Sequence, residues 1–328
     1  MHPRVKSLIW IGVGLILLIP AFFINLKDTH DWGGDFALYL EEAQLITEGK
    51  SVAENSYVFN PDHNRIGPAT YPIGFPLLLT YVHANHRFSF EAYNFFIALF
   101  YVLAGLMSFI FLKSRLKEIY ALLLTLVIFY NPIILQFKLE IMSGFPFMVF
   151  FLASLISYDK FRTKLWGAIL IGFLIGFAIL IRSLGWAMVG GVIIYFVLNR
   201  KTENLRNTLV ILGMTLITTT GLNLIFAGSA SGSDYSTLFN NYNFLETVYA
   251  NLYHSFISFQ MLFGGKEMDV KFLIVFIESA TLILAIFGLI KRIAKRQLQM
   301  FDWTFLLAMA LILVFPYSTV VGVRYITP

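Results

Sequence analysis

Long apolar runs separated by short polar segments dominate the chain. Each run approaches or reaches the length of a bilayer-spanning helix, and inside hydrocarbon a helix satisfies its own backbone hydrogen bonds. The runs cover residues 8–26, 92–112, 119–136, 141–158, 165–181, 184–198, 208–227, 271–290 and 303–323. The pattern therefore predicts an all-α, polytopic integral membrane protein with about nine transmembrane helices.

One further apolar segment, 71–84, is too short to be counted with these runs. It has fourteen residues and contains prolines at positions 72 and 76. A segment of this length is more typical of a re-entrant or interfacial helix than of a full span. We expect it to stay on one side of the membrane.

Composition supports the membrane assignment. Of the 328 residues 58% are hydrophobic and 13% are charged, about half the charged fraction of a soluble domain. The absence of cysteine excludes disulfides, thiolate metal sites and cysteine nucleophiles. The first apolar run resembles a signal peptide but is long enough to span, and no small-residue cleavage pattern follows it, so we expect a retained helix. Without an internal repeat, residues 1–328 are predicted to form one membrane domain.

The charges are distributed asymmetrically when the N-terminus is placed in the cytoplasm. The cytoplasmic segments then carry 15 of the 24 lysines and arginines but only four of the 19 acidic residues. The basic residues on this side are Arg4, Lys6, Lys113, Arg115, Lys117, Lys160, Arg162, Lys164, Arg200, Lys201, Arg206, Lys291, Arg292, Lys295 and Arg296. This is the positive-inside pattern, which predicts a protein of the cell (inner) membrane with the lipid bilayer as its partner. The net charge of +5 is thus a topology signal and does not indicate nucleic-acid binding.

Two long segments are predicted to lie on the extracytoplasmic side, a first outer loop over 27–71 and a second over 228–270. Loops of this length with their own polar pattern are usually functional. We therefore expect the functional site on the extracytoplasmic face.

The first outer loop contains a predicted interfacial helix of about 14 residues that begins near Asp35 and ends before Gly49. Asp35, Tyr39 and Glu42 follow one another at i, i+4 and i+7, so they share one stripe beside an apolar stripe. From its position alone Asp35 is either the N-cap of this helix or a catalytic carboxylate.

Five stretches resemble membrane-embedded GT-C glycosyltransferases, in particular the protein O-mannosyltransferase and aminoarabinose-transferase group. They cover most of the chain in the same order as in the family. The stretches are Gly34-Asp-Phe-Ala-Leu-Tyr39 with the following Ala43, Tyr71-Pro-Ile-Gly-Phe-Pro76, Ile141-Met-Ser-Gly-Phe-Pro-Phe147, Gly172-Phe-Leu-Ile-Gly176 followed by Arg182, and Gly322-Val-Arg-Tyr-Ile-Thr-Pro328.

The resemblance implies transfer of a sugar from a polyprenyl-phosphate donor to a hydroxyl of an unidentified acceptor, which is a lipid, a glycan or a protein. It implies no cofactor other than this lipid carrier. Asp35 is then the general base, and Glu140 is the candidate for the second catalytic carboxylate. The substrate-binding residues are Tyr39, Arg65, Tyr71, Arg182 and Arg324. Arginine suits the departing phosphate because its guanidinium makes charge-assisted, bidentate contacts.

The chain departs from the family pattern at Gly144, where relatives usually have an acidic residue after the serine. Glu140, about one helical turn earlier, is the nearest carboxylate and a candidate replacement. Alternatively the acid has been lost, which leaves a catalytically silent relative that binds lipid-linked sugar. A transporter or flippase of a lipid-linked or small polar substrate is the alternative from another class. Relatives continue beyond the position of Arg324, so a fragment of a longer protein is a further alternative.

The cationic and histidine candidates also have plainer interpretations. Arg182 stands at the end of an apolar run. An arginine in this position often extends its side chain so that its charge reaches the membrane surface. Arg65 and Arg324 fit solvated loop charges equally well. His63, His83 and His86 show no ligand spacing on one regular element, so no metal site is predicted.

Overall fold

The computed structural model describes residues 3–24, 26, 35–56, 71–200, 203–227, 243–262 and 271–314, and every regular element within them is helical. The elements are α1 (Pro3–Phe23), α2 (Asp35–Thr47), η1 (Val52–Glu54), α3 (Gly74–His86), α4 (Phe90–Lys113), α5 (Glu118–Phe129), α6 (Pro132–Phe137), α7 (Gly144–Phe161), α8 (Leu165–Ile181), η2 (Ser183–Gly185), α9 (Trp186–Asn199), α10 (Leu205–Phe226), α11 (Phe244–Leu262), α12 (Lys271–Ala294) and α13 (Met300–Val314).

The helical class is confirmed, and several long apolar helices indicate a membrane-embedded protein. Within the described residues four helices are long and apolar enough to cross a bilayer, namely Val5–Phe23, Phe90–Lys113, Gly144–Phe161 and Leu205–Phe226. The expected number of about nine is not confirmed. One reason is visible in the run 119–136, which is broken between α5 and α6. Asn131 accepts a hydrogen bond from the Ile133 N–H at 3.0 Å and Pro132 begins α6, so a new short helix starts there.

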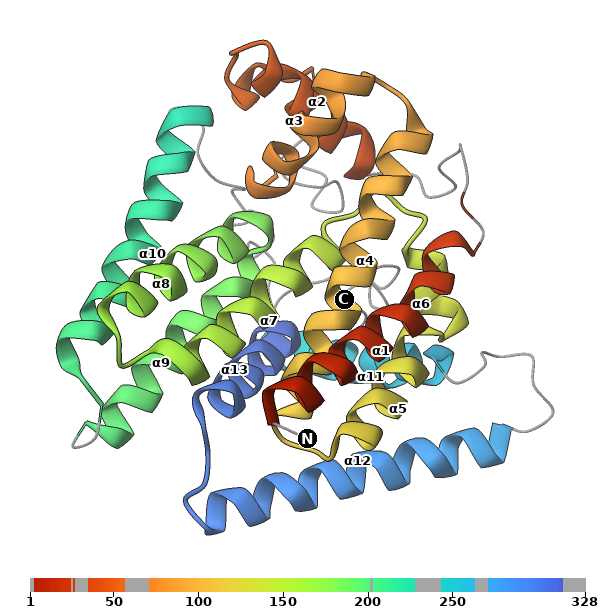
Figure 1. Ribbon diagram of the computed structural model, residues 1–328, viewed down its shortest axis with the longest axis vertical. Helices are drawn as coiled ribbons and strands as arrows, with labels where there is room; N and C mark the ends of the chain where they lie inside the picture. The colour runs from red at the N-terminus through yellow and green to blue at the C-terminus, as the bar shows by residue number, and fades with distance from the viewer. Residues whose placement is uncertain are drawn as a thin grey trace. The chain divides into compact units, whose positions relative to one another are not determined.

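The chain divides into two compact units, and each is described by itself. The first comprises residues 1–185 and 203–237, with α1 to α8 and α10, and the second residues 186–202 and 238–328, with α9 and α11 to α13. In the first unit α1 packs on α4, α4 on α7, α7 on α8, and α8 on α10, while α2 packs on α3 (Figure 1).

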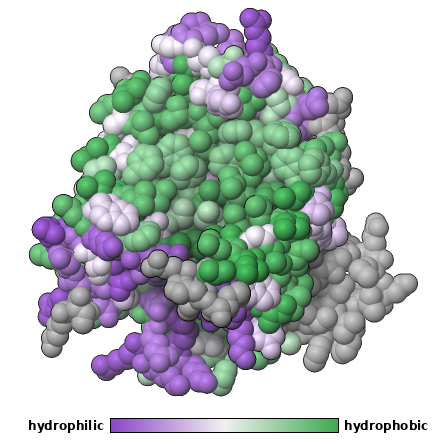
Figure 2. Space-filling view, in the orientation of Figure 1, coloured by the Kyte–Doolittle hydropathy of each residue, from purple (hydrophilic) through white to green (hydrophobic). Residues whose placement is uncertain are grey.

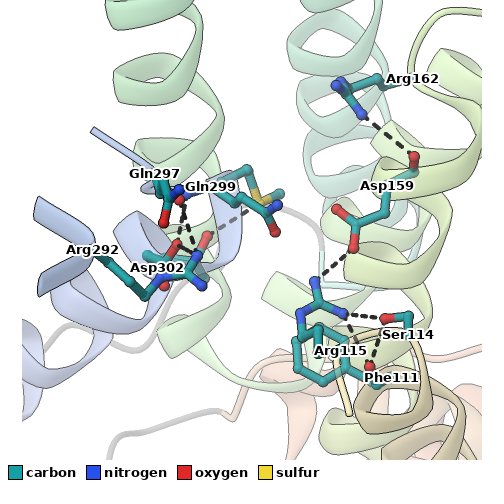
Figure 3. Close-up of polar contacts among 11 residues, drawn as sticks. Phe111, Ser114, Arg115, Asp159, Arg162, Arg292, Gln297, Gln299 and Asp302 are labelled. Carbon is teal, nitrogen blue, oxygen red and sulfur yellow. Dashed lines mark hydrogen bonds and ion pairs between the residues drawn. The ribbon is translucent and has the colours of Figure 1, made fainter. Parts of the chain in front are cut away.

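One end of the first unit gathers the predicted cytoplasmic charges and is called the basic end. Lys113 Nζ at the end of α4 lies 2.6 Å from Ser7 Oγ of α1, and Lys6 forms a 2.9 Å ion pair with Glu118 of α5. Arg115 pairs with Asp159 of α7 at 2.6 Å (Figure 3). These contacts join helix termini that the charge pattern assigned to the same side of the membrane.

The opposite end of the first unit is built by α2 and α3 and is called the α2–α3 end. Figure 2 shows hydrophilic residues over α2 and α3 and hydrophobic residues over the helices next to them. The expected surface helix is α2, with 13 residues, and the 71–84 segment is α3, which is not among the candidate spans. Two short helices are thus formed at the positions where the sequence predicted them.

Glycine spacing in α8 has a packing role. A Cβ on Gly172 would lie 2.5 Å from the carbonyl oxygen of Ile211 in α10. The hydroxyl of Thr215 donates to the Gly172 carbonyl at 3.2 Å. Small residues four positions apart permit such close contact between membrane helices. The glycine-rich stretch thus anchors α8, which ends next to Arg182, against α10.

In the second unit, residues 244–262 of the predicted second outer loop form the helix α11, which is not among the candidate spans. The side chain of Asn251 in α11 donates to the carbonyls of Ile312 and Leu313 in α13 at 3.1 and 2.9 Å. The side chain of Asn251 thus satisfies carbonyls in the last turn of α13 and connects the two helices.

Candidate active site

Arg182 lies at the end of α8, where the sequence predicted it. The backbone N–H of Arg182 donates to Ala178 at 2.9 Å, so the chain leaves the helix at this residue. The side chain is partly buried, and its Nε donates to the hydroxyl of Ser143 at 3.0 Å. Ser143 directly precedes α7 and is 2% exposed. Two of the family-like stretches therefore meet at a hydrogen bond between residues 39 positions apart.

Among the described residues, Arg182 forms no ion pair with a carboxylate, in contrast to other partly buried arginines. Arg162 pairs with Glu203 at 3.1 Å in the first unit. In the second unit Arg292 pairs with Asp302 at 2.6 Å (Figure 3). The neutral hydroxyl of Ser143 orients the Arg182 guanidinium, and no carboxylate among the described residues compensates its charge. A partly buried arginine can bind an external anion favourably, because the attraction between opposite charges is stronger where water is partly excluded and the guanidinium makes charge-assisted hydrogen bonds.

The turn between α6 and α7 places Glu140 beside this region of the chain. Glu140 is 3% exposed and precedes Ser143 by three residues. The structure puts it in a turn, since the Met142 N–H donates to the Glu140 carbonyl at 2.8 Å. Glu140 therefore lies in the same turn as Ser143, the residue whose hydroxyl accepts the hydrogen bond from Arg182.

Lys138, in the same turn, was not a sequence candidate, and the structure gives it a structural role. It is 0% exposed, and its Nζ donates to the carbonyls of Ala21 and Phe22 at 2.8 and 3.1 Å and also to Ile24. Burial lowers the pKa of Lys138 to about 8. The ammonium satisfies carbonyls at the end of α1, where a cation also complements the helix dipole. Lys138 therefore connects α1 to the turn that carries Glu140.

On α2, the predicted stripe of Asp35, Tyr39 and Glu42 is formed. Asp35 is the first residue of the helix and is partly buried. Tyr39 is 6% exposed, and its ring lies 4.6 Å from the ring of Tyr71 and 4.9 Å from that of Phe75. Two predicted substrate-binding tyrosines are therefore in contact. Aromatic rings of this kind can stack on the face of a sugar.

Glu42 is the residue whose importance the sequence did not reveal. It is 0% exposed, and its Oε1 accepts a hydrogen bond from the Tyr71 N–H at 2.9 Å. Its Oε2 is buried and has no hydrogen-bond partner among the described residues. Burial raises the pKa of Glu42 to about 8; the Tyr71 N–H opposes this shift and Glu41 adds to it. The i, i+4, i+7 spacing placed Glu42 on one stripe with Asp35 and Tyr39, but it did not indicate that the carboxyl group of Glu42 is buried.

The two groups of residues are linked through α3 and α8. A Cβ on Gly74 would lie 2.6 Å from the carbonyl carbon of Leu180, so only glycine allows this approach of the start of α3 to the end of α8. Ile73 and Leu180 also belong to one buried apolar cluster with Val52 and Ala227. Tyr71, three residues before Gly74, and Arg182, two after Leu180, therefore belong to neighbouring parts of the α2–α3 end.

Two predicted substrate-binding residues, Arg65 and Arg324, lie outside the described residues, as does His63. Within the described part of the chain, no group of three or more His, Asp or Glu side chains could hold a metal ion. His83 instead makes a buried contact of 3.2 Å between its Nδ1 and the hydroxyl of Tyr93.

Comparison with protein-family models, curated proteins and solved structures finds no match to this chain.

Proposed function

We propose that the chain is a membrane glycosyltransferase that moves a sugar from a polyprenyl phosphate to an acceptor hydroxyl on the extracytoplasmic face. The observation that carries the proposal is Arg182, a partly buried arginine oriented by Ser143 at 3.0 Å and without a carboxylate partner among the described residues. It follows an apolar helix of 17 residues, about 25 Å long, so it suits the depth of a lipid phosphate. The resemblance to GT-C glycosyltransferases supplies the substrate class.

The proposed reaction needs one base and one cation. The acceptor oxygen forms a bond to the anomeric carbon while the bond between that carbon and the phosphate oxygen breaks. The hydroxyl proton passes to Asp35, and the polyprenyl phosphate leaves with its negative charge held by Arg182. The leaving phosphate needs no proton. Tyr39 and Tyr71 would contact the sugar, and Glu140 is the candidate for the second acidic residue of the site.

A transporter receives less support from the helices. In all four candidate spans the charged residues fall in the first or last turn, as with Glu91 and Lys113 of α4. Transporters typically carry ionisable groups near the middle of the membrane, where they bind and couple their substrates. The charge placement therefore favours a site at the membrane surface. A catalytically silent relative that binds lipid-linked sugar would have the same placement of charges. It would differ from a transferase only in having no turnover.

Orientation is tested with single cysteines, because the chain has none of its own. Ala84 is exposed on α3, and Ser114 is exposed at the basic end. With the site outside, we expect Ala84→Cys to react with an impermeant maleimide in intact cells and Ser114→Cys to react only after permeabilisation. The reverse pattern would place the α2–α3 end in the cytoplasm and contradict the proposal.

The activity itself is tested by mass spectrometry of lipid and glycan pools from cells with and without the gene. Without the transferase, the amount of one polyprenyl-phosphate monosaccharide should rise, and one acceptor should lack the same sugar. Restoring the wild-type gene should reverse both changes, whereas restoring Arg182→Ala should not. Unchanged pools in cells that express the protein abundantly would contradict the proposal.

A further inference from the structure

Glu42 is a buried carboxyl group that the proposed reaction does not use. It connects α2 to the segment before α3, because its Oε1 accepts the Tyr71 N–H at 2.9 Å. This hydrogen bond spans 29 positions of the chain and lies beside the contact between the Tyr39 and Tyr71 rings. Glu42 therefore helps to fix where the Tyr71 ring lies.

The protonation state of Glu42 determines how stable the packing of residues 71–73, called the Tyr71 segment, against α2 is. A buried carboxylate needs donors at both oxygens, but Oε2 has none among the described residues. Burial raises its pKa from the ordinary 4.5 to about 8, so the group is mostly a neutral acid at pH 7. Glu42 belongs to α2, outside the candidate spans.

Among the described residues, the other titratable groups around Glu42 supply no countercharge. Glu41, its neighbour, accepts the Ser56 N–H at 2.7 Å and raises the pKa of Glu42 further. On the elements packed around α2, the remaining titratable groups in the described part of the chain are Asp35, Glu48 with Lys50, Glu54 of η1, His83 and His86 of α3, and the phenols of Tyr39, Tyr71 and Tyr81. Glu48 is paired with Lys50, Glu54 binds the Ser51 N–H, and His83 contacts Tyr93.

We infer that Glu42 is a positioning residue that holds the Tyr71 segment against α2 as a neutral acid and lets it open when the carboxyl ionises. Ionisation strengthens the one hydrogen bond that Glu42 accepts from the Tyr71 N–H. The charge on Oε2, however, needs water, and water is excluded while the Tyr71 segment packs against α2. The closed arrangement is thus favoured fully below pH 4.5, and this preference is lost as the pH rises through about 8. The inference rests on the proposed function in one respect, the assignment of Tyr71 to contact with the sugar.

The Tyr71 amide reports this opening directly through hydrogen exchange, and Pro72 contributes no competing amide. Purified protein in nanodiscs would be labelled between pH 6 and pH 9, with rates corrected for the intrinsic dependence on pH. In wild type we expect protection at Tyr71 to fall at least tenfold across this interval. Glu42→Gln, which keeps a neutral acceptor of the same size, should retain its protection at pH 9. Glu42→Ala should lose it at every pH.

Glu91→Gln is the matched control, because Glu91 is an exposed glutamate at the start of α4. Protection of the Tyr71 amide in Glu91→Gln should fall between pH 6 and pH 9 as it does in wild type. The inference is overturned if Glu42→Gln follows the wild-type pH dependence or lacks protection at pH 6.

Transfer activity provides the second readout. Its alkaline decline near pH 8 should disappear in Glu42→Gln, whereas a catalytic acid at this position would make that variant inactive at all pH values. Because exchange requires no substrate, a preparation without transfer activity but with the expected exchange would contradict the proposed function and leave the role of Glu42 intact.

Discussion

Replacing Asp35 by asparagine is expected to lower the rate of sugar transfer by at least about 10²-fold, because an amide cannot accept the acceptor proton as a general base. Asparagine has the size of aspartate, and at the first residue of α2 it loses only the modest interaction of a carboxylate with the helix dipole, so the start of α2 should be retained. If Asp35 only stabilises α2, the substitution should cost well under about 1 kcal/mol and transfer should continue.

This prediction is checked by the turnover rate and thermal unfolding of wild type and Asp35→Asn in the same nanodisc preparation. Affinity for the donor lipid should persist, because the phosphate is assigned to Arg182 and not to Asp35. Glu91→Gln, which neutralises an exposed carboxylate at the start of α4, is the control for the loss of a charge. Near-normal turnover by folded Asp35→Asn would remove Asp35 from the mechanism and make α2 a scaffold.

Replacing Arg182 by alanine is expected to weaken binding of the polyprenyl-phosphate donor by about 10- to 100-fold. Hydrogen bonds to a charged group contribute about 1.5–3 kcal/mol each, and about 1.4 kcal/mol corresponds to a factor of ten. Arg182→Lys should recover only part of the loss, because lysine lacks the planar pair of donors. Arg115→Ala serves as control, since Arg115 is paired with Asp159 at the basic end.

Helix positions were predictable wherever a hydrophobic period or a terminator stands in the local sequence. The run 165–181 coincides with α8, and the stripe that begins at Asp35 coincides with the 13 residues of α2. Asparagine before proline favours a new helix start, so Asn131-Pro132 is a local signal for the break between α5 and α6. The sequence analysis nevertheless treated 119–136 as one run, because the residues on both sides of the break are apolar. Residues 244–262, which form α11, lack a continuous apolar run of spanning length.

The environment of single polar residues was less predictable, because it depends on partners far along the chain. Glu42 is buried by contacts with α3 and with the Tyr71 segment, 29 positions away. Arg182 meets Ser143 across 39 positions, and only the resemblance placed both near one site. Spacing along one helix defines which residues share a face, but not what covers that face.

The central claim is that a lipid phosphate binds at Arg182, and binding of polyprenyl phosphate to the purified protein tests it most directly. Wild type and Arg182→Ala in nanodiscs would each be titrated with polyprenyl phosphate and with the corresponding polyprenol, which lacks the phosphate. We expect wild type to bind the phosphate lipid about 10- to 100-fold more tightly than the alcohol, and Arg182→Ala to bind both lipids equally weakly. Equal affinity of wild type for the two lipids, or full preference for the phosphate in Arg182→Ala, would contradict the account.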